Sequence, residues 1–142
     1  MGVTIYSTNC SNDLGSGGFL RLRKTIASLC PDDIKEHYLR LTDHEREIQI
    51  KDPDFTEYDA KTAELYLKHK TAYGKVIKFL WASDVEARFS YGVAKQLLKL
   101  IGSYDDNAVY GYAGWGDKAM RFKDFKAILK DAAETKTYWG WY

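Results

Sequence analysis

VTIYSTNCSNDLGSGGFLRLRKTIAS, residues 3–28, is the stretch that decides the fold. Apolar and polar residues alternate from Gly2 to Ser7, which predicts an edge-type strand. The small and polar residues from Thr8 to Gly18 predict a loop, and a basic amphipathic helix is expected to begin near Phe19. A strand that leads through such a loop into a helix creates an anion site, because the free amides of the first helical turn and the helix dipole point toward the loop.

The start of this helix is the candidate ligand site. Its apolar residues Phe19, Leu22, Ile26 and Leu29 fall at helical spacing, so the basic residues are expected on the other faces. We expect the loop amides and these cations to hold phosphate, through Ser16, Gly17, Gly18, Arg21, Arg23 and Lys24. A purely structural turn is the alternative, because the glycines match neither GxxxxGK[ST] nor GxGxxG.

Helices are expected to dominate the rest of the chain. Pro31 ends the first helix and suits the first turn of the next, whose apolar stripe runs to about Thr42. The charged segment from Asp43 to Asp54 predicts an exposed excursion or a weak edge strand. A helix is predicted over Ala60 to Ala72, stopped by Gly74; Val76 to Trp81 is either a buried strand or a last helical turn.

The last third of the chain combines two helices with short aromatic strands. Ser90 can cap a helix that ends where Gly102 provides a left-handed C-cap, and a second helical stripe begins at Phe122. Val109 to Tyr112 and Thr137 to Tyr142 predict strands. Pairing the last strand with the first would place both ends of the chain in one small sheet. The predicted class is α+β, a single compact domain over residues 1–142 with about four helices and two to four strands.

Composition limits the functional classes. With 21 Lys and Arg against 20 Asp and Glu, the formal charge is +1. The protein therefore lacks the overall positive field that drives binding to duplex nucleic acid. A net charge near zero still allows a local basic patch. No apolar run reaches the length of a membrane span or a signal sequence, so we expect a cytoplasmic protein without a membrane partner. The 4 Trp and 11 Tyr suit a core, a ligand or a subunit contact, so a homo-oligomer is one expectation.

Catalytic and metal signatures are weak. Asp84 and Glu86 could hold a metal or act as an acid and base, but a hydrogen-bonded turn is the favoured interpretation. The spacing of His37, His44 and His69 is unlike that of metal ligands, so solvated histidines are expected. Neither cysteine lies in a catalytic signature, and no cofactor is predicted. A metal-dependent hydrolase is therefore the least favoured function.

Three groups of motifs carry a resemblance. They are Asp13-Leu14-Gly15-x-Gly17-Gly18-Phe19-x-x-Leu22-Arg23, Phe79-Leu80-Trp81-x-Ser83-Asp84-x-Glu86, and Phe122-x-x-Phe125 followed by an aromatic strand. In these motifs the chain resembles small uncharacterised proteins of phages and prophages of Gram-positive bacteria. The resemblance implies a setting, a phage gene that acts in the bacterial cytoplasm, where small accessory proteins counter host defence. It implies no activity.

Two functions follow as hypotheses. In the first, the protein captures a phosphate-bearing small molecule, such as a nucleotide immune signal, without transforming it, and Trp81, Tyr112 or Trp115 stacks on a base. In the second, the protein inhibits a host or phage protein through an aromatic surface, and the glycine loop is only structural.

Overall fold

A four-stranded antiparallel sheet holds the first and last strands of the chain. The structure is a computed structural model that describes residues 2–113 and 118–142. The strand order is β2-β1-β6-β3, formed by β1 (Gly2–Tyr6), β2 (Ser11–Gly15), β3 (Ala87–Phe89) and β6 (Trp139–Trp141). Ile5 pairs with Trp141, so the predicted pairing of the N-terminal strand with the terminal aromatic strand is confirmed. The α+β class is confirmed with it.

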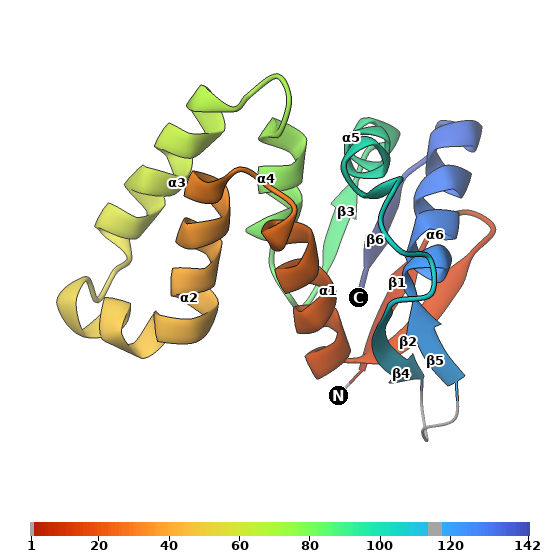
Figure 1. Ribbon diagram of the computed structural model, residues 1–142, viewed down its shortest axis with the longest axis horizontal. Coiled ribbons are helices and arrows are strands. Elements are labelled where there is room, and N and C mark those ends of the chain that lie inside the picture. Colours follow the sequence, from red (N-terminus) through yellow and green to blue (C-terminus); the bar gives the residue numbers. More distant parts are fainter. Residues whose placement is uncertain (1, 114–117) are drawn as a thin grey trace.

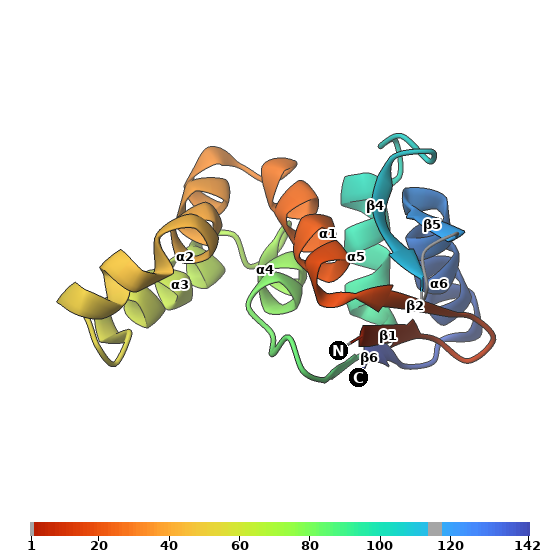
Figure 2. The same cartoon turned by 90° about the horizontal axis from the view of Figure 1, so that it is seen from below.

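Six helices and a second, two-stranded sheet complete the described residues. The helices are α1 (Ser16–Ser28), α2 (Asp32–Lys51), α3 (Thr56–Lys68), α4 (Gly74–Leu80), α5 (Tyr91–Ile101) and α6 (Phe122–Thr135). The small sheet pairs β4 (Val109–Ala113) with β5 (Lys118–Arg121). The helices α1, α4, α5 and α6, which we call the body helices, lie on one side of the four-stranded sheet. The helices α2 and α3 form a pair that projects away from it (Figures 1 and 2).

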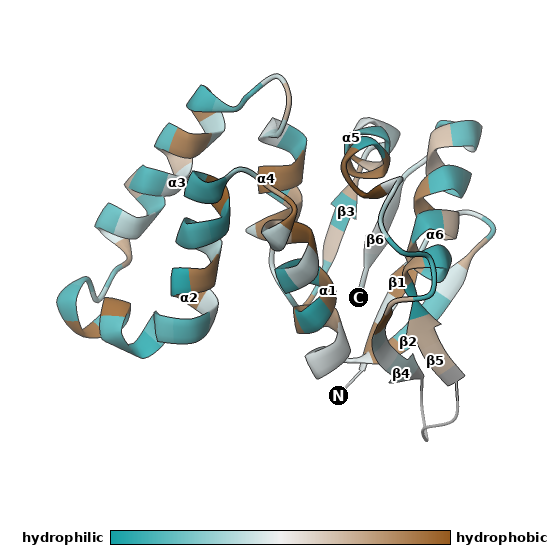
Figure 3. Ribbon diagram, viewed as in Figure 1, coloured by the Kyte–Doolittle hydropathy of each residue, from teal (hydrophilic) through white to brown (hydrophobic). Residues whose placement is uncertain are grey.

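The core lies between the four-stranded sheet and the body helices. Val3, Ile5, Trp139 and Trp141 point inward, and Trp139 and Trp141 are 0% and 1% exposed. Their rings pack around Phe79 of α4, at centroid distances of 5.9 and 5.7 Å. The apolar faces of α4 and α5 turn toward this core, whereas the α2–α3 pair is largely hydrophilic (Figure 3). Burial of large aromatic side chains therefore fixes the last strand beneath the helices.

Several sequence predictions are corrected. The expected loop contains β2, because residues 11–15 pair with β1 in full register despite their polar character. The segment from Asp43 to Asp54 is mostly helical, since α2 continues to Lys51 across a kink at His44. Gly102 has a right-handed conformation with φ −56°, so it is no left-handed C-cap.

The apolar window Val76 to Trp81 resolves in favour of a helix. Residues 74–80 form α4, a helix of their own that follows the turn after α3, and the helices number six in place of the four expected. Val109 to Tyr112 is confirmed as a strand within β4. No helix in residues 2–113 and 118–142 combines the length and apolar character needed to cross a membrane.

Candidate functional site

The glycine sequence forms the junction between β2 and α1. Gly15 is the last residue of β2 and the N-cap of α1, so Ser16, Gly17 and Gly18 form the first helical turn, and α1 begins three residues earlier than predicted. Among the described residues no side chain caps this N-terminus, and its first turn holds no acidic residue. The amides at this end of α1 and the positive end of the helix dipole are therefore left to attract an anion.

A cleft of about 610 Å³ opens beside this first turn, between α1, α2 and the segment 80–84. We call it the α1–α2 cleft. Its size is typical of small-molecule sites. Apolar side chains from all three segments form the larger part of its wall, beside several polar and charged groups. Its lining includes Ser16, Gly17, Arg23, Glu45, Trp81 and Asp84.

Arg23 is the cation inside this cleft, and its burial corrects the sequence prediction. The residue is 5% exposed and lies on the core side of α1, whereas the helical pattern predicted an outward position. Its Nη2 donates to the main-chain carbonyls of Phe79 (2.8 Å), Leu80 (2.5 Å) and Ala82 (2.7 Å). The guanidinium also lies near three aromatic rings, 5.2–5.7 Å from the centroids of Phe19, Phe79 and Trp141.

No carboxylate in the described part of the chain forms an ion pair with Arg23, and its Nε is buried without a hydrogen-bond partner there. Burial lowers the pKa of the guanidinium, and the nearby Tyr38 and Asp84 act in the opposite direction. Carbonyl dipoles and ring faces thus stabilise the charge without neutralising it. Arg23 is a structural cation that also makes the potential within the cleft more positive.

Trp81 forms the far wall of the cleft and is fixed by hydrogen bonding. Its Nε1 donates to the hydroxyl of Tyr58 (3.0 Å), which in turn donates to the carbonyl of His37 (2.7 Å). The rings of His37 and Tyr58 stack at 3.9 Å, and the edge of Trp81 meets Tyr38 at 5.4 Å. This network joins α2, α3 and α4, so Trp81 is a rigid surface beside the cleft.

The other predicted site residues do not all meet at the cleft. Arg21 is exposed, and its Nη2 lies 3.9 Å from the position of a β-carbon built on Gly17, beside the first turn of α1. Lys24 is paired with Asp43 at 2.7 Å. Gly18 is buried against β4 and exposes no surface to a ligand.

The two remaining aromatic candidates lie elsewhere. Tyr112 is 54% exposed on β4 and is not part of the cleft wall, and Trp115 lies outside the described residues. Of the predicted set, the structure therefore places Ser16, Gly17, Arg23 and Trp81 around one cleft, with Arg21 at its edge.

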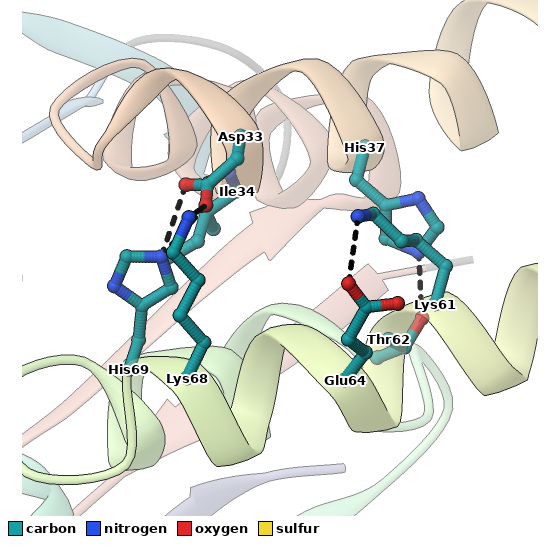
Figure 4. A network of polar contacts seen from close by, with 8 residues as sticks. All are labelled: Asp33, Ile34, His37, Lys61, Thr62, Glu64, Lys68 and His69. Atoms are coloured by element: carbon teal, nitrogen blue, oxygen red, sulfur yellow. Dashed lines mark hydrogen bonds and ion pairs between the residues drawn. The ribbon is translucent and has the colours of Figure 1, made fainter.

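The α2–α3 pair contains polar groups that the sequence interpretation missed. His37 is 3% exposed, and its Nε2 lies 2.7 Å from the hydroxyl of Thr62. Asp33 meets Lys68 (2.7 Å) and His69 (2.9 Å) (Figure 4). Of the three histidines, His44 alone is well exposed. The predicted solvated state is thus wrong for His37 and for His69. Contacts between α2 and the α3 segment bury these histidines, and such contacts cannot be predicted from the residue spacing along either helix alone.

The carboxylates considered for hydrolysis lie in the turn before β3. The amide of Val85 donates to Ser83 Oγ at 3.2 Å, as expected of a hydrogen-bonded turn. Asp84 lies at the rim of the α1–α2 cleft, and Glu86 is exposed outside it. Within residues 2–113 and 118–142, no three His, Cys, Asp or Glu side chains are grouped so that they could hold a metal ion.

A scan against protein-family models and searches of curated proteins and of solved structures find no match to this chain.

Proposed function

We propose that the protein captures a small ligand with one phosphate group in the α1–α2 cleft and does not transform it. The observation that carries the proposal is the meeting of Ser16, Gly17, Arg23 and Trp81 around a single cleft. The uncapped first turn of α1 supplies amide donors for phosphate oxygens, and the exposed guanidinium of Arg21 lies beside that turn.

The remainder of the cleft suggests how the rest of the ligand binds. Trp81 is half-buried and offers aromatic surface to a planar group such as a base, while the rings of Phe19 and Tyr38 are buried beneath the same wall of the cleft. Glu45 and Asp84 add two negative charges, which disfavour a second phosphate but can accept hydrogen bonds from hydroxyl or amino groups. This combination fits a nucleotide that presents a single phosphate to α1. The phage setting and the antagonism of host defence implied by the resemblance belong to the same proposal.

A Gly17→Asp variant tests the site without weakening the fold. A β-carbon at residue 17 meets nothing closer than 3.9 Å among the described residues. A carboxylate in the first turn is stabilised by the helix dipole, but it repels phosphate. The protein is incubated with a panel of linear and cyclic nucleotides, and thermal shift and the chemical identity of the recovered ligand are measured. We expect an intact ligand to be retained by the native protein and by Gly17→Ala, and lost from Gly17→Asp.

Arg21→Ala should weaken retention, and Arg46→Ala, which removes an exposed arginine from α2, is the matched control. Retention that survives Gly17→Asp would refute this site. Recovery of an altered nucleotide would refute capture and indicate an enzyme.

A second candidate, inhibition of a protein partner, is favoured by the outer face of the four-stranded sheet. No helix of the described residues covers that face (Figure 2), and Tyr138 and Tyr142, which flank β6, are 57% and 66% exposed. A second copy of the chain is one such partner. Replacing both tyrosines by Ser should then reduce the native mass or abolish partner binding, whereas Tyr112→Ser, at an exposed tyrosine of β4, should not.

A further inference from the structure

Positive charge is concentrated in one part of the chain. Residues 65–104 contain seven Lys and Arg but only two Asp and Glu, a formal charge of +5 with histidine neutral. Because the whole chain carries +1, the remaining residues sum to −4. The nearly neutral total therefore conceals a strongly basic segment, which includes α4 and α5. Such a local field attracts anions even when the net charge is small.

Three lysines of this segment surround a hollow of about 470 Å³ between the start of α4 and α5. They are Lys75, Lys95 and Lys99, and we call the hollow the basic cleft. All three are exposed, and none forms an ion pair with a carboxylate among the described residues. In the part of the chain that the structure describes, no acidic side chain contributes to its wall. The hollow is therefore lined by cations that the protein itself does not neutralise.

The ammonium groups follow one face of α5. The Nζ of Lys75 lies 2.8 Å from the position of a β-carbon built on Gly92, so this lysine from α4 rests over the first turn of α5. Residues 92, 95 and 99 are spaced three and four apart, which places them on the same side of the helix. With a rise of about 1.5 Å per residue, the three positions span roughly 10 Å along the axis. A row of this length can contact several phosphate groups of one small ligand.

Gln96 holds the two sides of the basic cleft together. Its Oε1 accepts from the amides of Lys75 (2.7 Å) and Val76 (3.0 Å), and its Nε2 donates to the carbonyl of Thr71 (3.1 Å). The side chain thus binds the start of α4 to α5 from within the cleft wall. The backbone that carries the lysines is therefore held in place before a ligand binds, which lowers the entropic cost of binding.

The same arrangement is unfavourable without a ligand. Lys95 and Lys99 are four residues apart on a helix, a spacing at which like charges repel. The nearest compensation for Lys95 is the ring of Tyr91, 5.3 Å from its Nζ, and that contact neutralises no charge. A bound polyanion would relieve this repulsion for all three lysines at once.

We propose that the basic cleft binds a compact polyanion with two or more phosphate groups, at a site separate from the α1–α2 cleft. The hollow favours a small molecule over an extended chain, because its volume falls within the range of small-ligand pockets. The phosphate groups contact the lysines, and Tyr73 and Thr71 border the remaining surface.

Calorimetric titration with inorganic tripolyphosphate tests this proposal. The test variant is Lys75→Gln/Lys95→Gln/Lys99→Gln. The control, Lys51→Gln/Lys123→Gln/Lys130→Gln, removes the same charge from exposed lysines outside the basic cleft. We expect the native protein and the control to bind alike and the test variant to lose at least about tenfold in affinity. Gly17→Asp should bind tripolyphosphate normally, which separates this result from the fate of the α1–α2 cleft.

Three results would overturn the proposal. The first is the absence of binding by the native protein at low salt. The second is an equal loss in the control, which would reveal general charge attraction in place of a site. In the third, a single-stranded oligonucleotide binds to the three lysines while tripolyphosphate does not, which would assign the surface to a nucleic-acid backbone.

Discussion

Gly18 in α1 and Gly111 in β4 approach so closely that a β-carbon built on either would lie 3.0 Å from the α-carbon of the other. This contact presses the first turn of α1 against the two-stranded sheet. The glycines of the junction therefore differ in their roles. Gly18 is required by packing, whereas Gly17 faces the α1–α2 cleft and has room for a side chain.

Gly18→Ala should destabilise the protein by about 1–3 kcal/mol, because the added methyl group meets backbone atoms that cannot move independently. Gly17→Ala is the matched control. There the methyl group fits, and alanine in a helix is favoured over glycine by roughly 0.5–1 kcal/mol. Urea unfolding of both variants checks the difference. Equal stability of the two would show that the junction with β4 is loosely packed.

Removal of the Arg23 guanidinium should destabilise the fold, because its hydrogen bonds to three main-chain carbonyls are lost. We expect Arg23→Met to lower the free energy of unfolding by about 3 kcal/mol or more. All three bonds converge on one nitrogen, so the ammonium of Arg23→Lys can replace part of them. Chemical unfolding should rank the proteins native, Lys, then Met. If the Arg23→Met variant were as stable as the native protein, the hydrogen bonds to the carbonyls would not contribute to stability.

The burial of Arg23 is a feature that the sequence could not predict. Alternation of apolar and polar residues predicted the first strand, and the aromatic residues of Thr137 to Tyr142 predicted the last one. The pairing of the two strands was then expected. A charged residue within a helix predicts a solvated position unless its partners are known. The partners of Arg23 lie 56–59 residues away, at the end of α4.

For the candidate site, the sequence predicted several of the residues but not how they come together. Ser16 and Gly17 were predicted from the flexible sequence before a basic helix, and Trp81 from its aromatic character; the structure places all three around one cleft. That Trp81 and Gly17 line the same cleft depends on how Arg23 of α1 holds the end of α4, which no local pattern encodes. β2 was missed because its polar residues lack alternation, and only the register with β1 makes it a strand.

Lys126 is a second buried cation whose loss should be measurable. It is 4% exposed, and its Nζ donates to the carbonyl of Tyr104 (2.6 Å) and to Asp106 Oδ1 (2.6 Å). Lys126→Met should reduce the free energy of unfolding by about 2–4 kcal/mol, because it leaves the loop after α5 without its donor. Asp106→Asn keeps an oxygen acceptor at a solvent-exposed position and should have a smaller effect. Thermal unfolding of both variants at neutral pH decides between them.

His37 should make the stability of the protein depend on pH in mildly acidic solution. Burial, with a further contribution from Arg40, lowers the pKa of His37 from 6.5 to about 4. The folded protein therefore binds fewer protons than the unfolded chain between these values, so stability falls as the pH drops from about 6.5 to about 4. The loss over this window should reach roughly 2–3 kcal/mol. Urea unfolding at a series of pH values measures it.

His37→Gln separates this effect from that of Asp33. Hydrogen bonds from Lys68 and His69 hold the pKa of Asp33 well below its usual value of 3.8. This carboxylate stabilises the folded state above that value, and its contribution is lost only as the pH falls below it. His37→Gln should therefore flatten the stability profile between pH 6.5 and 4 while the decline at lower pH remains. A variant that kept the full slope above pH 4 would exclude His37 as its source.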